Sequence, residues 1–321
     1  SKISEMTRES GSRGNFQRQS NSFTTPFGDG PGELPVEAGR YRLIAGAICP
    51  WAHRQVIVRE LLGLTDAISL GWVDPVRTEN GWRFALDADG RDPVLGIEYL
   101  IEAYRATDPD YDKRGTIPAV VDVTTGAVVQ NDYHRLTNYW ETAWKPFHAA
   151  DAPDLYPLEL RDDIDAFNAR LFDEVNNGVY KCGFAVSQQA YSDAYDTLFA
   201  ALDRLEERLA SRRFLFGDFI TDSDVRLYVT LARFDAAYYG GFKANRQRLV
   251  AFEHLWAYAR DLYQTPGFGS TTDFDGIKRG YFGSPGVTSV NGIVPKGPDT
   301  SGWDAPHGRE RLSGTSEKFR R

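Results

Sequence analysis

Residues 47–54 read AICPWAHR, and they decide the fold because they join a predicted strand to a predicted helix. The apolar run from Tyr41 to Ile48 predicts the strand, and the pattern from Pro50 to Leu62 predicts the helix. Cys49 therefore stands at a helix N-terminus, where backbone N–H groups and the helix dipole favour the thiolate over the thiol. Proline suits the first helical position because it needs no N–H partner there.

The spacing is that of a thioredoxin-type Cys-x-x-Cys motif, with Ala52 in place of the second cysteine. Cys49 cannot close a local disulfide, but it can form one mixed disulfide that an external thiol then releases. A lone cysteine is more often a small buried hydrophobic residue than a nucleophile, and we interpret Cys182 in that way. For Cys49 the strand, proline and helix around it favour the catalytic interpretation.

The composition excludes several classes of function. The 321 residues allow two domains, and a hydrophobic content of 41% supports packed cores. A net charge of -8 argues against a general nucleic-acid binder, and no apolar run reaches the length of a membrane span. Ser1 to Ser22 lacks the apolar core of a signal peptide, and two cysteines make no disulfide framework, so the expected compartment is the cytoplasm. Without clustered His and Cys at zinc spacing, no metal is expected.

The pattern downstream of Cys49 predicts an α/β thioredoxin-like domain. The predicted element order is β-α-β-α-β-β-α, and its β-α-β start implies parallel strands. The polar stretch from Asp74 to Arg91 is predicted to be a loop near the site, with Trp82 inside it. The remaining predicted elements are a strand at Ile68–Val73, a helix at Val94–Ala106, a strand entered by Ile117-Pro118, a strand at Ala127–Gln130 and a helix starting near Asn131-Asp132.

Pro118 is the second informative position. A proline in an apolar strand is confined to an edge or to the strand start. In thioredoxin-like folds this proline is cis and lies beside the reactive cysteine, which turns the preceding backbone N–H and C=O toward the ligand. An ordinary edge proline is the alternative. The N–H groups of the helix expected near Asn131-Asp132 can hold an anionic group of a thiol ligand.

Helical periodicity replaces strands beyond about Asp151 and predicts an all-α second domain. Within it, Thr221 and Asp224 form a capping box, which we interpret as structural rather than as acid–base chemistry. The predicted organisation is an extended arm at 1–40, the thioredoxin-like domain at 41–145, the helical domain at 151–265 and a C-terminal extension packed on the body at 266–321. The predicted helices are Leu158–Asn177, Gln188–Ala210, Asp222–Tyr239 and Leu249–Tyr263.

Several motifs make the sequence similar to a known family over nearly its whole length. It resembles the Xi class of glutathione transferases, the glutathionyl-hydroquinone reductases. The motifs that carry the resemblance are CPWAHR at 49–54, NGVYKCGFA at 177–185, FGD at 216–218, RFD at 233–235, FK at 242–243, DLYQTPG at 261–267, IKR at 277–279 and GIVP at 292–295.

The resemblance implies a role for each matched residue. Cys49 matches the nucleophile, and Tyr180 matches the tyrosine that donates a proton to the leaving hydroquinone. Tyr238 and Tyr281 match tyrosines whose hydroxyls stabilise the thiolate. Buried tyrosines bonded to backbone carbonyls are the ordinary alternative. The residues that match the thiol-binding pocket are Trp82, Arg114, Gly115, Thr116, Ile117, Pro118, Asp132 and Tyr133.

One position departs from the family pattern. In the family, Glu-Ser at the helix start holds the γ-glutamyl group of glutathione, whereas this chain has Asp132-Tyr133. The shorter carboxylate and the bulky ring leave two thiols open as co-substrate, glutathione and the mycothiol of actinobacteria. The implied partners are this thiol, quinone or hydroquinone adducts, and a second copy in a homodimer, with neither nucleic acid nor membrane.

Two other functions remain open from the sequence. A transferase that conjugates a thiol to an electrophile uses a Ser or Tyr hydroxyl, and a reactive cysteine hinders it because mixed disulfides form. A non-catalytic interaction module with a transferase-like fold has no need of Cys49, Tyr180, Tyr238 and Tyr281 together.

Overall fold

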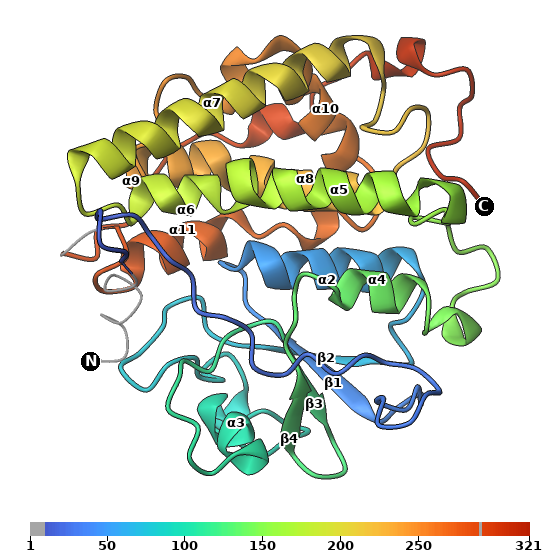
Figure 1. Cartoon of the computed structure of the whole chain (residues 1–321), viewed down its shortest axis with the longest axis vertical. Helices are drawn as coiled ribbons and strands as arrows, with labels where there is room; N and C mark the ends of the chain where they lie inside the picture. Colours follow the sequence, from blue (N-terminus) through green and yellow to red (C-terminus); the bar gives the residue numbers. More distant parts are fainter. Residues whose placement is uncertain (1–9, 289–290) are drawn as a thin grey trace. The chain divides into compact units, whose positions relative to one another are not determined.

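The computed structural model describes residues 10–288 and 291–321, which divide into two compact units (Figure 1). The first unit holds Gln19–Ala152 and the described part of Asp275–Gly292. The second holds the described part of Thr7–Arg18, Pro153–Phe274 and Ile293–Arg321. Both the N-terminal arm and the C-terminal extension therefore contribute residues to each unit.

The first unit is built on a four-stranded sheet in the order β2-β1-β3-β4. The strands are β1 (Tyr41–Ala45), β2 (Ser69–Trp72), β3 (Ala119–Asp122) and β4 (Ala127–Gln130). β1 pairs in parallel with β2, as a β-α-β crossover requires, and antiparallel with β3, which pairs antiparallel with β4. Every residue of β1 and β3 is buried, as expected for the two central strands. This is the predicted thioredoxin-like sheet.

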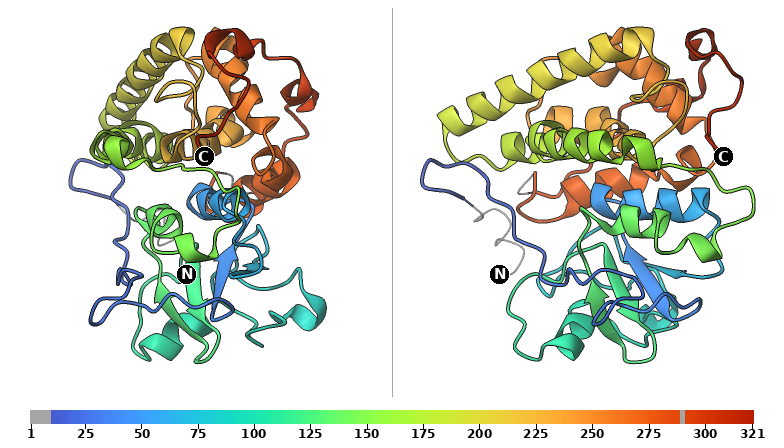
Figure 2. Two further views of the ribbon diagram at one scale, coloured as in Figure 1. Left: turned by 90° about the vertical axis from the view of Figure 1, so that its right-hand side faces the viewer. Right: turned by 45° about the vertical axis from the view of Figure 1, so that its right-hand side comes forward.

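Helices cover this sheet. α2 (Pro50–Leu61) contacts β1 and lies beside α4 (Leu136–Glu141), whereas α3 (Ile101–Thr107) contacts β4 (Figure 1). α2 ends where Gly63 adopts a positive φ of 68° that other residues rarely adopt. The late helix α11 (Phe274–Gly283) also belongs here, and Figure 2 shows it (orange) beside α2 (blue).

Two predicted helices of this unit begin later than expected. The prediction of a helix from Val94 was wrong, because the carboxylate of Asp92 accepts the N–H groups of Val94 and Leu95 and holds a turn. Gly96 continues that turn with a φ of 70°, and α3 starts only at Ile101. The helix expected near Asn131-Asp132 begins instead at Leu136, after a bonded turn.

The second unit is helical, as predicted, and its long predicted helices are divided into shorter pieces. Two π-helical turns, η4 (Phe172–Asn176) and η5 (Phe234–Tyr238), interrupt them. The helices are α5 (Arg161–Leu171), α6 (Gly178–Gly183), α7 (Gln188–Ser211), α8 (Asp222–Arg233), α9 (Tyr239–Gly241) and α10 (Glu253–Tyr263). Its short 3₁₀ turns are η3 (Leu158–Leu160), η6 (Leu249–Ala251), η7 (Gly269–Thr271), η8 (Ser301–Asp304) and η9 (Arg309–Leu312), whereas η1 (Ala88–Gly90) and η2 (Lys145–Phe147) belong to the first unit.

The predicted capping box is present at the start of α8. Asp224 accepts the Thr221 N–H at 2.8 Å, and the same carboxylate also accepts the Tyr258 hydroxyl at 2.6 Å. It is buried, so the motif is structural. Among residues 10–288 and 291–321, no helix is both long enough and apolar enough to cross a membrane. In the same described ranges, His, Cys, Asp and Glu side chains form no group of three or more able to hold a metal ion.

Candidate active site

Cys49 is the N-cap residue of α2, and two backbone groups surround its sulfur. Its Sγ accepts the Ala52 N–H at 3.4 Å and lies 3.4 Å from the carbonyl oxygen of Ile117. The residue is 8% exposed and is not in a disulfide. The helix N-terminus is therefore directed at the sulfur, an arrangement that stabilises negative charge there.

The Ile117-Pro118 peptide bond is cis, as expected for this fold, and it leads directly into β3. The Ile117 carbonyl faces Cys49, and the preceding carbonyl, of Thr116, accepts the Tyr104 hydroxyl at 2.6 Å. Tyr104 is buried on α3, and burial raises its pKa, so the hydroxyl remains a donor. Tyr104 of α3 thus holds the loop before β3 at Thr116, while the backbone of the next residue, Ile117, contacts the sulfur.

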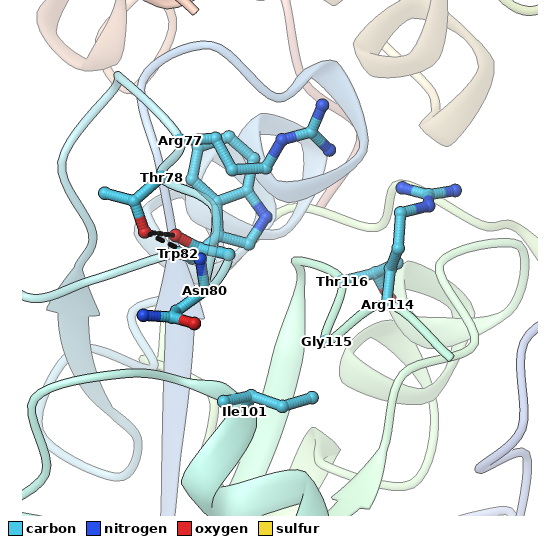
Figure 3. A pocket seen from close by; sticks show the side chains of 9 residues that line it. Arg77, Thr78, Asn80, Trp82, Ile101, Arg114, Gly115 and Thr116 are labelled. Atoms are coloured by element: carbon cyan, nitrogen blue, oxygen red, sulfur yellow. Dashed lines mark hydrogen bonds between the residues drawn. The ribbon is translucent and has the colours of Figure 1, made fainter. Parts of the chain in front are cut away.

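The same loop also borders a small pocket (Figure 3). Trp82 and Arg77 form one wall, and the Arg114–Thr116 backbone forms the wall facing it. The Arg77 guanidinium lies 5.4 Å from the centre of the Trp82 ring, a distance typical of a cation–π contact. The residues lining the pocket are Arg77, Thr78, Asn80, Gly81, Trp82, Ile101, Arg114, Gly115 and Thr116.

Four of the predicted thiol-binding residues therefore share one pocket: Trp82, Arg114, Gly115 and Thr116. The other lining residues, Arg77, Thr78, Asn80, Gly81 and Ile101, were not predicted. Arg77 precedes Trp82 by five residues in the same polar insertion, where Arg83 is the cation adjacent to Trp82, so no sequence signal singles out Arg77. Its backbone N–H donates to the Ser284 hydroxyl just after α11 at 3.2 Å, a contact between residues 207 positions apart.

Asp132 and Tyr133 lie on the turn before α4. The N–H of Asp132 donates to Gln130 Oε1 at 2.7 Å, and its carboxylate accepts the His134 N–H at 3.2 Å. The N–H of Tyr133 donates to the Asn131 carbonyl at 3.0 Å. The N–H groups expected to receive a thiol ligand at this position are therefore used within the turn itself.

The Tyr133 ring is 5% exposed and stacks on Trp51, with centroids 5.3 Å apart and planes 16° apart. Trp51 belongs to the first turn of α2, two residues after Cys49. The guanidinium carbon of Arg54 lies 4.9 Å from the centre of the Trp51 ring, and Nη1 of Arg54 donates to the Tyr133 carbonyl oxygen at 3.5 Å. The bulky residue that departs from the family pattern thus packs against the cysteine motif.

Tyr281 lies on α11, with 1% of its surface exposed. Its neighbour Gly280 brings the helix against the strand–helix junction, because a Cβ added there would lie 2.6 Å from the Cβ of Ile48. Only glycine allows this approach. α11 therefore packs one residue away from Cys49, although more than two hundred residues separate them in the chain.

The other two predicted tyrosines belong to the second unit. Tyr180 on α6 and Tyr238 at the end of η5 are both buried, with ring centroids 5.8 Å apart. Phe242 contacts both rings, at 5.1 Å and 5.2 Å. Tyr180 follows the π-helical turn η4, and Tyr238 is the last residue of the π-helical turn η5. Such turns are frequent at functional sites. The fold of this unit therefore brings Tyr180 and Tyr238 together.

Cys182, the other thiol, has a different environment. It is 1% exposed on α6, and burial raises its pKa to about 12. At neutral pH it is a protonated, apolar side chain, as predicted.

Comparison with known proteins agrees with this architecture. A family model for the C-terminal domain of glutathione S-transferases matches residues 188–261. Glutathionyl-hydroquinone reductase YqjG of Escherichia coli is 38% identical over 309 residues, covering 92% of this chain and 93% of that protein.

Solved structures are similar over the same extent. A glutathione transferase from Gordonia bronchialis is 54% identical, with a TM-score of 0.87, covering 89% of this chain and 88% of that one. The Xi glutathione S-transferase from Phanerochaete chrysosporium is 38% identical, with a TM-score of 0.87, covering 92% of this chain and 96% of that one. The chain therefore belongs to the glutathionyl-hydroquinone reductase family, the Xi class of glutathione transferases.

Proposed function

We propose that this protein removes a low-molecular-weight thiol from thiol-conjugated hydroquinones through a mixed disulfide on Cys49. The observation that carries the proposal is the position of the Cys49 sulfur at the N-terminus of α2, where it accepts the Ala52 N–H. Ala52 occupies the place of a second cysteine, so the mixed disulfide has no resolving partner within the motif.

The reaction proceeds in two displacements. The Cys49 thiolate attacks the sulfur of the conjugate, an S–S bond forms and the carbon–sulfur bond breaks. The electron pair of that bond passes to the aromatic ring carbon, which takes a proton from Tyr180 and leaves as the hydroquinone. A second thiol then attacks the mixed disulfide, forms the small disulfide and returns Cys49 to its thiolate. The ring carbon of the conjugate is reduced, and the sulfur it releases leaves joined to one free thiol as a disulfide.

The three tyrosines divide between proton donation and charge stabilisation in this scheme. Tyr180 is the proton donor, and Tyr238 and Tyr281 donate hydrogen bonds to the thiolate, since each phenol can donate one. Support comes from the pairing of Tyr180 with Tyr238 in one aromatic cluster, and from the contact of the Tyr281 helix with Ile48. The same proposal assigns thiol binding to the pocket residues and to Ile117, Pro118, Asp132 and Tyr133.

Glutathione is the co-substrate that we propose, and mycothiol is the alternative. Arg77 and Arg114 line the pocket, and guanidinium groups suit a carboxylate, which glutathione carries and mycothiol lacks. The Escherichia coli relative has been solved with glutathione bound. Asp132-Tyr133 favours mycothiol, because the ring fills space at the position that holds the γ-glutamyl group in the family.

The proposal extends to assembly and compartment. A cycle that consumes a small thiol pool needs a reducing compartment, which supports the cytoplasm. The family resemblance supports a homodimer, and sedimentation tests it directly against the 36.0 kDa mass of one chain.

The decisive variant is Cys49→Ser, assayed for thiol-dependent release of hydroquinone from a glutathionyl conjugate and from a mycothiol conjugate. The expected result is loss of release with either conjugate, while Cys182→Ala retains turnover within about twofold because that thiol is buried and protonated. Near-normal turnover in Cys49→Ser would refute the mechanism. Conjugation of an electrophilic arene by the parent chain, with no release activity, would favour a conjugating transferase instead.

A further inference from the structure

We infer that two consecutive residues of the N-terminal arm, Arg18 and Gln19, are positioning residues for the reaction. Gln19 holds the Arg114 wall of the thiol pocket, and Arg18 acts on Tyr180. The inference rests on the proposed function, since it assigns each residue to one part of that reaction. The sequence around these residues, RGNFQRQSNS at 13–22, is polar and gave no reason to expect either contact.

The Gln19 side chain binds both the backbone N–H and the backbone carbonyl of one residue in the pocket wall, Arg114. Its Oε1 accepts the Arg114 N–H at 3.2 Å, and its Nε2 donates to the Arg114 carbonyl at 3.3 Å. The Tyr111 hydroxyl donates to the same carbonyl at 3.0 Å. The side-chain amide thus pairs with the Arg114 backbone as a neighbouring strand would.

These hydrogen bonds fix the position of the Arg114 backbone in the pocket wall. Gly115 follows directly, and a Cβ there would lie 3.2 Å from side-chain atoms of Ile101 and Tyr104, so the backbone already approaches α3 closely. Tyr104 fixes the Thr116 carbonyl from that side. Gln19 and Tyr104 therefore hold the Arg114–Thr116 segment at both ends, opposite Trp82 (Figure 3). Loss of Gln19 lets the segment move, and precise placement of binding groups is what ligand affinity depends on.

Arg18 makes its contacts in the second unit. Its Nε donates to Asn177 Oδ1 at 2.8 Å, and its guanidinium carbon lies 4.5 Å from the centre of the Tyr180 ring. Phe16 of the same arm packs on Phe184 at 5.3 Å, and Phe184 stacks on Tyr180. The arm is therefore anchored to the aromatic cluster, with a guanidinium over the face of the proposed proton donor.

The charge of Arg18 has a direct chemical consequence. A phenol that gives up its proton becomes negative, and part of that charge resides on the ring. A cation over the ring stabilises this state, and the effect grows where water is partly excluded. Tyr180 is 6% exposed, so little solvent screens the pair. Arg18 thus assists the proton transfer without touching the substrate.

Substitutions of the two residues should affect different kinetic parameters, the KM for the thiol at Gln19 and kcat at Arg18. Gln19→Met keeps the length of the side chain and removes both hydrogen bonds, so the KM for the thiol should rise about tenfold with kcat within twofold. Binding of glutathione and of mycothiol, measured by titration calorimetry in a Cys49→Ser background, should weaken by the same factor. Gln189→Met is the matched control, because the Gln189 side chain donates to Asp193 on the exposed face of α7.

Arg18→Gln keeps a donor for Asn177 and removes the charge. It should lower kcat about tenfold, leave the KM for the thiol within twofold, and enlarge the solvent deuterium isotope effect on kcat, because proton transfer becomes slower. Arg18→Lys keeps a cation and should recover most of the rate. Arg204→Gln, which removes an exposed partner of Glu174, is the control for loss of charge.

The outcomes separate this inference from the function on which it rests. If neither thiol binds the parent chain and no conjugate is reduced, both fail. If the parent chain is active but Gln19→Met binds thiol as the parent does, the role of Gln19 is refuted alone. Unchanged kcat and isotope effect in Arg18→Gln refute the role of Arg18. A common fall of kcat and rise of KM in both variants, with lowered Tm, would indicate that the arm is only structural.

Discussion

The carbonyl oxygen of Ile117 lies 3.4 Å from the sulfur of Cys49, although the two residues are 68 positions apart. This contact joins the start of α2 to the loop before β3, and the same loop continues into the pocket wall at Thr116. One short backbone segment, residues 114–117, therefore borders both the Cys49 sulfur and the pocket.

Tyr133 gives a prediction about thiol choice. Tyr133→Ser removes a ring that stacks on Trp51 beside Cys49 and opens space at the turn before α4. We expect kcat/KM with glutathione to rise roughly fivefold relative to mycothiol, and the free energy of unfolding to fall by about 3 kcal/mol from loss of the buried ring. Tyr133→Phe, which keeps the stack, should behave as the parent. An unchanged ratio of the two thiols would show that this ring does not govern thiol choice.

Gly280 gives a prediction about α11. Gly280→Ala places a Cβ 2.6 Å from the Cβ of Ile48, so the helix must move away from the junction that carries Cys49. The expected cost in stability is about 1–3 kcal/mol, as in other overpacked contacts, and kcat should fall several-fold as Tyr281 moves with its helix.

Gly240→Ala is the matched control for that variant, because nothing lies within 4 Å of a Cβ at Gly240. Urea unfolding and steady-state rates measure both variants. Equal behaviour of the two alanine variants would contradict the close packing of α11.

Asp224 predicts a pH dependence of stability. Burial raises its pKa from 3.8 to about 6, although hydrogen bonds from Tyr258, Leu215 and Thr221 oppose the shift. Between these values the folded state holds the proton more tightly than the unfolded state, so the contribution of Asp224 to stability falls as pH rises from 4 to 6. The loss amounts to about 3 kcal/mol and is complete above the folded pKa.

Asp224→Asn isolates this effect, since the amide stays neutral across the range. The variant loses part of the helix cap at every pH, which costs about 1 kcal/mol. Measured by urea unfolding, the stability of the variant relative to the parent should rise by about 3 kcal/mol between pH 4 and pH 7, so that it is the less stable protein at pH 4 and the more stable one at pH 7. A deficit that does not change with pH would refute the titration of this carboxyl.

The two cysteines predict selective alkylation. Burial holds the pKa of Cys182 at about 12, so its thiol stays protonated at pH 8, whereas the Cys49 sulfur lies at a helix N-terminus. Iodoacetamide should label native protein once, at Cys49, and urea-unfolded protein twice. Peptide mapping locates the label, and labelling of native Cys182 at a similar rate would contradict its burial.

Local patterns predicted the elements that local forces determine. The strand–proline–helix junction at Cys49, the strand at Ala127–Gln130 and the capping box at Thr221 were all confirmed. Side-chain hydrogen bonds explain where helix starts were wrong, since Asp92 holds a turn where hydrophobic periodicity alone indicates a helix. The π-helical turn that precedes Tyr180 and the one that ends at Tyr238 likewise leave the apolar pattern nearly unchanged, and so they were not predicted.

Long-range packing explains what the sequence did not reveal of the site. Motifs identified Cys49 and Trp82 as candidates, but Arg77 lines the pocket through an insertion with little pattern. Gln19 reaches Arg114 across 95 positions, which no local periodicity can indicate. From the sequence, Gly280 is an ordinary helix-weakening residue, and only its packing against Ile48 shows why glycine is needed there.

The most direct test of the central claim is the intact mass of the protein mixed with a glutathionyl-hydroquinone in the absence of free thiol. The account predicts release of one equivalent of hydroquinone and a mass increase of one glutathionyl group, located at Cys49 and removed by added thiol. Release of hydroquinone with no mass added to the protein, or with the added mass located away from Cys49, would contradict it.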